Sequence, residues 1–270
     1  MTGVQTCALP SYGSSLNLTA GNAILRANGG VGSFINALDT SVSNLEASGG
    51  SGSVLLDNYR PLTIGQISGV VGVSTTTGQI RINNQGSLTI AENVIGGSLI
   101  SLLVGDAAGT GDDLTVQSGV IVRSTSAKID LAAGDDVYLQ GFSLVEAPNG
   151  SVFIKGDSAN ADALGAFISI DGIINSKSGA LVNGDSDADE VLVDAMGTGG
   201  LTLDLLGGND HYRINYPTSS TFGSTITVND SAGGTDLVSV FGTNNPDELF
   251  LTTQAPPTTA TSPASPPRSC

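Results

Sequence analysis

The sequence has few of the residues that nucleic-acid-binding, membrane-spanning and helical proteins need. Only 9 residues are Lys or Arg, against 25 Asp or Glu, and the formal net charge is −16 over 270 residues. Phosphate contacts and basic membrane-binding surfaces both require Lys and Arg, so we expect neither nucleic acid nor an anionic membrane surface as a partner. No run of 18 or more apolar residues occurs, and this predicts that the chain does not insert into a membrane.

Residues that commonly build catalytic and metal sites are also scarce. Trp is absent, and His211 is the sole histidine. Neither a His-based catalytic triad nor a cluster of His ligands can therefore be assembled. The two cysteines, Cys7 and Cys270, lie near opposite ends of the chain. A structural disulfide is not expected, so the fold must hold without one.

Both ends of the sequence differ in composition from the rest. The first ten residues, "MTGVQTCALP", resemble the peptide translated from a common sequencing-library adapter, except that Ser11 follows Pro10 where the usual readthrough has Ile. The last sixteen, "APPTTATSPASPPRSC", have the Pro/Thr/Ser composition of an extended linker. We therefore expect four regions: a non-native or disordered leader at 1–13, β-repeats at 14–183, further acidic β-repeats continuing them at 184–254, and a disordered tail at 255–270.

The body of the chain is predicted to be all-β and repetitive. Short runs rich in Val, Ile, Leu and Thr alternate with clusters of Gly, Asn, Asp and Ser, and Gly alone accounts for 37 residues. One series of equivalent runs recurs at intervals of 23 to 31 residues: Leu62–Ile64, Leu88–Ile90, Leu114–Val116, Val137–Leu139, Ile168–Ile170 and Val191–Val193. A second series lies between its members: Val54–Leu56, Ile80–Ile82, Ile129–Leu131, Val152–Ile154 and Ala180–Val182.

This spacing predicts a right-handed parallel β-helix (β-solenoid) with coils of about 25 residues, in which stacked coils share one core. The alternation places Leu114 and Val116 inside and Thr115 outside. Asn58, Asn83 and Asn84 are expected at corners in left-handed conformations. The rival fold is a pair of β-sandwich domains, which would have antiparallel hairpins instead.

Pairs of acids precede many of the runs, as in "GDDLTV" (Gly111–Val116) and "PDELFL" (Pro246–Leu251). If coils stack in register, such acids form a column in which neighbours repel by about 0.9 kcal/mol in water. Calcium, which prefers carboxylate, amide and carbonyl oxygens, would relieve this repulsion. The alternative is that the acids only mark turns and keep the surface soluble. The candidate calcium ligands are Asp112, Asp113, Asp135, Asp136, Asp187, Asp189, Glu190 and Asp210.

The ordered set of repeats resembles the large repetitive β-strand proteins of bacterial surfaces, of the filamentous-haemagglutinin adhesin type. The resemblance rests on "LNLTAGNAILRANGG" (Leu16–Gly30), "RPLTIGQI" (Arg60–Ile67), "STTTGQIRINNQGSLTI" (Ser74–Ile90) and "TDLVSVFGTNNPDELFLT" (Thr235–Thr252). It implies a non-enzymatic structural or adhesive fragment of a longer secreted or surface-anchored protein. Its partners would be a surface glycan or protein, or further copies of the chain joined through the open solenoid ends.

An enzyme remains the alternative function, because polysaccharide lyases and glycoside hydrolases also use parallel β-helices. Such a site needs acids gathered in an aromatic-lined groove, with Arg81 or Arg123 as a lyase base. The fragment "LGGNDHY" (Leu206–Tyr212) in turn resembles part of a hemolysin-type calcium nonapeptide but lacks the full G-G-x-G-x-D pattern. It is therefore a weak second indication of calcium.

Overall fold

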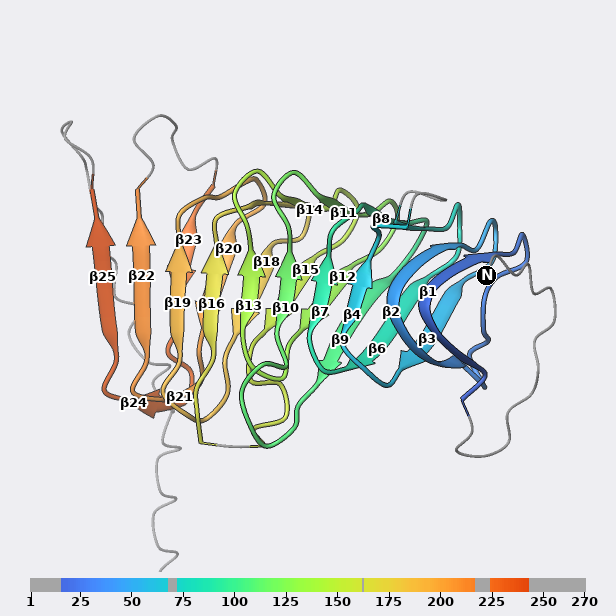
Figure 1. Ribbon diagram of the computed structural model, residues 1–270. Coiled ribbons are helices and arrows are strands. Elements are labelled where there is room, and N and C mark those ends of the chain that lie inside the picture. Colours follow the sequence, from blue (N-terminus) through green and yellow to red (C-terminus); the bar gives the residue numbers. More distant parts are fainter. Residues whose placement is uncertain (1–15, 68–71, 162, 217–223, 243–270) are drawn as a thin grey trace, which may run out of the picture.

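The chain forms one parallel β-solenoid (Figure 1). The computed structural model describes residues 16–67, 72–161, 163–216 and 224–242. Within these ranges there are strands and turns but no helix, and every paired strand runs parallel to its neighbour. The prediction of a β-solenoid is confirmed, and the rival sandwich with antiparallel hairpins is wrong. The expected leader and tail lie outside the described residues.

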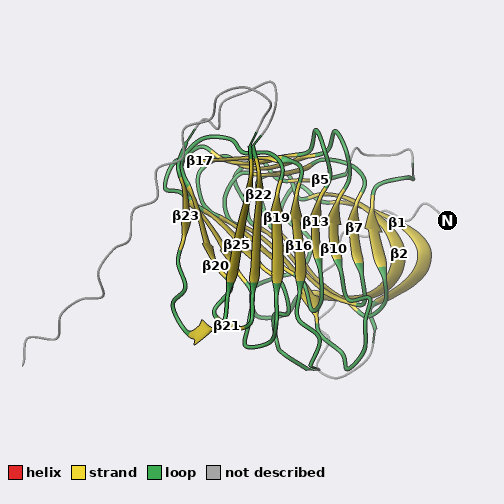
Figure 2. Cartoon of the chain, turned by 90° about the vertical axis from the view of Figure 1, so that its left-hand side faces the viewer, coloured by secondary structure: helices red, strands yellow, loops and turns green. Residues whose placement is uncertain are grey.

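Three faces make up each complete coil, and 23 strands join in a single sheet that winds around the molecule. Face A consists of β3 (Val54–Asn58), β6 (Ile80–Gln85), β9 (Ile100–Gly105), β12 (Ile129–Ala132), β15 (Val152–Lys155), β18 (Ala180–Asn183), β20 (Leu201–Asp204) and β23 (Ile226–Val228). Face B consists of β4 (Leu62–Ile64), β7 (Leu88–Ile90), β10 (Leu114–Val116), β13 (Val137–Leu139), β16 (Phe167–Ile170), β19 (Glu190–Val193), β22 (His211–Asn215) and β25 (Leu237–Phe241). The strands of face B stand side by side in Figure 2.

Face C is shorter and has only five strands of its own. They are β5 (Val73–Ser74), β8 (Val94–Gly96), β11 (Ile121–Ser124), β14 (Leu144–Ala147) and β17 (Ile173–Ser176). At the N-terminal end, β1 (Leu18–Arg26) pairs along β2 (Leu38–Ser48), and β2 bends far enough to pair with the first strand of each face. Two Gly-Gly pairs, β21 (Gly207–Gly208) and β24 (Gly233–Gly234), form a separate small ladder.

The register follows the repeats in the sequence. On face B, Leu114 pairs with Leu88 of the coil before it and with Val137 of the coil after it. Val137 pairs in turn with Ile168, although these two are farther apart in sequence than other neighbours on face B, because β15 ends at Lys155 and β16 begins only at Phe167. Both predicted series are therefore true columns of the solenoid.

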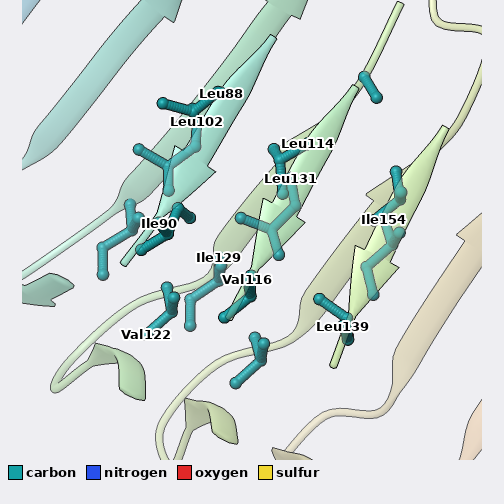
Figure 3. Packing of buried hydrophobic residues seen from close by; sticks show 14 of the residues in the cluster. Leu88, Ile90, Leu102, Leu114, Val116, Val122, Ile129, Leu131, Leu139 and Ile154 are labelled. Carbon is teal, nitrogen blue, oxygen red and sulfur yellow. The ribbon is translucent and has the colours of Figure 1, made fainter. Parts of the chain in front are cut away.

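The core lies between the three faces and runs the length of the molecule. Leu114 and Val116 are fully buried and Thr115 between them is only half-buried, as the alternation predicts. Figure 3 shows Leu131 and Ile154 of face A packed near Leu114 and Leu139 of face B. A single coil would leave its apolar side chains exposed above and below. Contact with the neighbouring coils therefore supplies most of the burial.

The asparagine corner differs from the expectation in its backbone. Asn58 and Asn84 are buried at the ends of β3 and β6, but neither they nor Asn83 have positive φ. The left-handed conformation occurs at Gly86, with φ of 82°. The Asn58 amide donates to Asn84 Oδ1 over 2.8 Å, and Asn84 donates to the Gly86 carbonyl over 2.6 Å. These side chains link coils by hydrogen bonds and do not supply the turn.

Strands β19, β20, β22, β23 and β25 continue the same sheet as far as Phe241. The part of the chain that the structure describes contains no helix long and apolar enough to cross a membrane.

Candidate functional site

The acids singled out in the sequence come together along one edge of the solenoid. We call this the acidic edge: it is the corner at which the chain enters face B. Because Leu114 pairs with Val137, and Glu190 with His211, the acids just before these strands are stacked coil on coil. Its members are Asp112, Asp113, Asp135, Asp136, Asp189, Glu190, Asp210 and Asp236. Asp187 lies in the loop leading into it, and Pro246–Leu251 lies outside the described residues.

In the first half of the edge, carboxylates accept hydrogen bonds from the backbone of the following coil. Asp113 Oδ1 accepts from the Asp136 amide over 3.3 Å. Asp136 Oδ1 accepts from the Phe167 amide over 2.7 Å. Asp135 adds a bond in the other direction, since its Oδ2 accepts from the amide of Asp112 over 2.7 Å. Backbone N–H groups thus offset part of the repulsion between stacked acids.

In the second half, the carboxylates accept from the preceding coil. Asp189 Oδ1 accepts from the Ala166 amide over 2.6 Å, and Asp210 Oδ1 accepts from the Asp189 amide over 3.0 Å. Asp236 Oδ1 accepts from the Asp210 amide over 2.9 Å. The carboxylates on either side of one coil therefore both accept hydrogen bonds from it. In this coil, Ala166 and Phe167 occupy the positions on the edge at which the other coils have acids. This coil supplies N–H donors to both sides, which explains why the acidic pattern is interrupted there.

Burial makes two of these carboxylates unusual. Asp189 and Asp210 are each only 2% exposed. Burial raises the pKa of Asp189 to about 7, although backbone bonds from Asp185 and Ala166 act against this. Burial likewise raises the pKa of Asp210 to about 6, helped by the charges of neighbouring acids. These two carboxylates therefore hold protons more tightly than an ordinary surface carboxylate would.

A second group of acids lies in the loops beside the edge. Asp106 Oδ2 accepts from the Ala161 amide over 2.7 Å and so ties the loop at 106–113 to the segment at 156–161 that follows β15. Lys155 Nζ lies 2.9 Å from Asp185 Oδ2. Burial alone would raise the pKa of Asp185, but hydrogen bonds from Lys155 and Asn160 outweigh it and hold the pKa below its ordinary value.

Asp157 belongs to this second group, and sequence reasoning missed it. It is 4% exposed, its backbone has a left-handed φ of 45°, and its Oδ2 is buried without a hydrogen-bond partner. Burial raises its pKa to about 6, and the nearby Asp185, Asp106 and Asp187 carboxylates add to the shift. It is a single acid after a strand, whereas the pattern considered was of acids before strands.

No ready-made metal centre is present among the residues described. No three His, Cys, Asp or Glu side chains in those ranges converge as a set that could hold a metal ion. Six of the eight predicted ligands already accept backbone hydrogen bonds: Asp112, Asp113, Asp135, Asp136, Asp189 and Asp210.

The residues considered for catalysis are not gathered together. Arg81 lies on face A in β6, and Arg123 lies on face C in β11, where it pairs with Glu146 of the next coil. Neither strand belongs to the acidic edge. His211 lies on face B, and its Nε2 is 2.9 Å from Ser239 Oγ.

The Arg123–Glu146 pair bridges adjacent coils, and we expect it to contribute little to stability. Its side chains are 40% and 23% exposed, and partly exposed ion pairs are typically worth less than about 1 kcal/mol. A double-mutant cycle with Arg123→Ala and Glu146→Ala, measured by urea unfolding, should give a coupling below about 1 kcal/mol that shrinks in high salt. A coupling of several kcal/mol would show that the pair is a principal link between coils.

Comparisons with known proteins give no family assignment: the chain matches no family model, no curated protein and no solved structure.

Proposed function

We propose that this chain is a non-enzymatic structural or adhesive module of a large secreted or cell-surface bacterial protein. One observation supports this most directly: acidic and basic side chains that could serve in catalysis or metal binding form bonds between coils. Acids on the acidic edge accept backbone hydrogen bonds from neighbouring coils. The longer ionic side chains do the same, as in the pair between Arg213 and Glu190 of adjacent coils.

Such an arrangement suits a module that must resist extension. Each coil is joined to the next by a parallel ladder, by a shared apolar core and by side-chain bonds at two corners. Because these contacts act between nearest neighbours, stability grows with the number of coils. The secreted or surface location, and a glycan or protein ligand for an adhesive face, follow from the resemblance to bacterial surface repeats and remain part of the proposal.

Pulling experiments provide the direct test of a load-bearing role. The full chain, tethered between marker domains in an atomic force microscope, should extend in small successive steps as coils detach, at forces above those that unfold the markers. A single low-force transition would contradict a load-bearing role. Beads coated with the chain should also adhere to glycan-coated or cell surfaces if one face is adhesive.

The enzyme alternative is tested separately on polysaccharides. Polyuronates and neutral glycans incubated with the chain should show neither unsaturated products nor new reducing ends. Turnover that depends on Arg81 or Arg123 would replace the structural proposal by a lyase. The two assays are independent, so a failure of adhesion is not mistaken for catalysis.

A further inference from the structure

One row of side chains crosses the outer surface of face A. Parallel pairing places its members side by side on the successive strands β6, β9, β12, β15 and β18: Arg81, Ser101, Asp130, Phe153 and Leu181. The two residues that flank each of them in its own strand are buried in the core. Because side chains alternate along a strand, these five face outward, and we call them the outward row.

The polar half of the outward row contains two atoms without a hydrogen-bond partner. Arg81 Nε, a donor, and Asp130 Oδ1, an acceptor, are both buried and unpaired. Their residues lie one strand to either side of Ser101, whose short side chain lies between them in the row. None of the ion pairs among the described residues involves Arg81, whereas Lys128 Nζ lies 2.8 Å from Asp130 Oδ2. Unpaired polar atoms are costly, so a ligand that pairs with both of them relieves that cost.

The other half of the outward row is apolar. Phe153 is half-buried, and Leu181 beside it is 37% exposed. Ligand sites typically combine apolar and aromatic surface with a few polar groups that fix the orientation of the ligand. The outward row has both components on five adjacent strands, and the apolar face of a sugar ring can stack on an aromatic ring such as that of Phe153.

The charges at the outward row favour a neutral ligand. Arg81 and Lys128 are positive and Asp130 is negative, while the chain as a whole carries a net charge of −16. A polyanion would be repelled by the chain, and a cation would meet two positive side chains beside the one carboxylate. A hydroxyl group both donates and accepts hydrogen bonds, so neutral sugars can pair with Arg81 Nε and with Asp130 Oδ1.

A protein partner fits the outward row less well than a sugar does. A stable protein–protein interface buries about 800 Å² on each partner, contributed by 20 or more residues. The outward row has five, and among them Ser101 is only 8% exposed.

We propose that the outward row of face A binds neutral oligosaccharides. Sugar hydroxyls would accept from Arg81 Nε and donate to Asp130 Oδ1, and a sugar ring would stack on Phe153. The inference rests on the proposed function, since it names the face and the ligand class through which the module adheres. The two unpaired atoms are shielded from solvent in the free chain, so the Arg81 side chain must turn before a hydroxyl reaches them. Rotamer changes at a surface are fast and do not limit binding.

The test is a titration of the full chain with neutral cellotetraose, mannotetraose and galactotetraose at millimolar concentration, followed by nuclear magnetic resonance. At least one of them should bind and shift the Arg81 Nε–H resonance, which a merely structural role of Arg81 would leave in place. The anionic tetragalacturonate should bind at least about tenfold more weakly, because it meets the negative charge of the chain.

Two variants assign the binding to the outward row. Arg81→Lys keeps the charge but lacks the Nε–H group, and Phe153→Ala removes the aromatic ring. Each should weaken binding of the neutral oligosaccharide by about tenfold or more. Arg123→Lys is the matched control, because Arg123 makes the same change on face C, outside the row. Circular dichroism should show all three variants folded, and Arg81→Lys alone decides the matter if Phe153→Ala is not.

The proposal is overturned if none of the neutral oligosaccharides binds, if tetragalacturonate binds as tightly as they do, or if Arg81→Lys and Arg123→Lys bind equally. Its failure is distinguishable from a failure of the proposed function. If beads coated with the parent chain and with Arg81→Lys adhere equally to glycan-coated surfaces, adhesion lies on another face and only this inference fails. If neutral oligosaccharides bind the row but the chain extends in a single low-force transition, this inference stands and the load-bearing role fails.

Discussion

Replacing Leu131 by alanine should lower the free energy of unfolding by about 2–5 kcal/mol. Leu131 lies in β12 and is fully buried. It pairs with Leu102 of the preceding coil and with Ile154 of the following one, so the cavity would weaken two interfaces between coils (Figure 3). In a solenoid, stability depends on such nearest-neighbour interfaces, and no other part of the molecule can compensate.

Thr115→Ala provides the control for this substitution. Thr115 lies on face B with its side chain outward, between two buried neighbours, and replacement should change stability by no more than about 0.5 kcal/mol. Urea unfolding followed by circular dichroism measures both variants. Hydrogen exchange should show that the loss of protection in Leu131→Ala is greatest in β9, β12 and β15. Equal stability of the two variants would mean that the coils are not held by this core.

The sequence predicted the solenoid because its columns are visible as repeated apolar runs. Leu88, Leu114 and Val137 are three successive members of one column, and each begins a run with one outward residue in its middle. Face A was predicted with three of its strands missing, which are β9, β20 and β23. The residues of β9, Ile100–Gly105, form a nearly continuous apolar stretch without clear alternation. Face C was not predicted as a series, because strands such as β5 are only two residues long.

The stacking of acids was predictable, but their hydrogen bonding was not. Periodicity alone places Asp113 above Asp136, since each precedes an equivalent strand. Which backbone amide each carboxylate accepts depends on loop lengths, and the direction reverses at the coil containing Ala166. Likewise, the periodic pattern does not predict that Asp187 Oδ2 and Asp210 Oδ2 are buried without a hydrogen-bond partner. Sequence reasoning therefore found the edge but not the individual atoms that matter there.

Loss of one buried charge should stabilise the protein at alkaline pH. We expect Asp157→Asn to raise the free energy of unfolding at pH 8 by roughly 1–3 kcal/mol and to leave it nearly unchanged at pH 4. Burial first, and then the charges of Asp185, Asp106 and Asp187, raise the pKa of Asp157 from 3.8 to about 6 in the folded chain. The folded state therefore binds this proton more tightly than the unfolded state does.

The sign of the effect follows from that difference in proton affinity. Below pH 4 the carboxyl is protonated in both states, and its favourable contribution is fully present. As the pH rises toward and through 6, the folded chain loses this contribution, and at pH 8 it must hold a buried anion whose Oδ2 has no partner. Asparagine stays neutral throughout, and its oxygen can still accept the backbone hydrogen bond from Asn160 that the carboxylate accepts now.

Urea unfolding at pH 4, 6 and 8 in EDTA would measure this effect without interference from bound cations. Asp57→Asn is the matched control: Asp57 lies on face A, away from the acidic edge, and its Oδ1 accepts from the Asn83 amide over 2.7 Å. It should not stabilise the chain at pH 8. If the stability difference between Asp157→Asn and the parent chain does not vary with pH, the pKa of Asp157 is not raised in the folded chain. If the variant instead loses stability only at pH 8, the carboxylate must be paired with a cation that survives EDTA, and burial would not be the dominant influence on this residue.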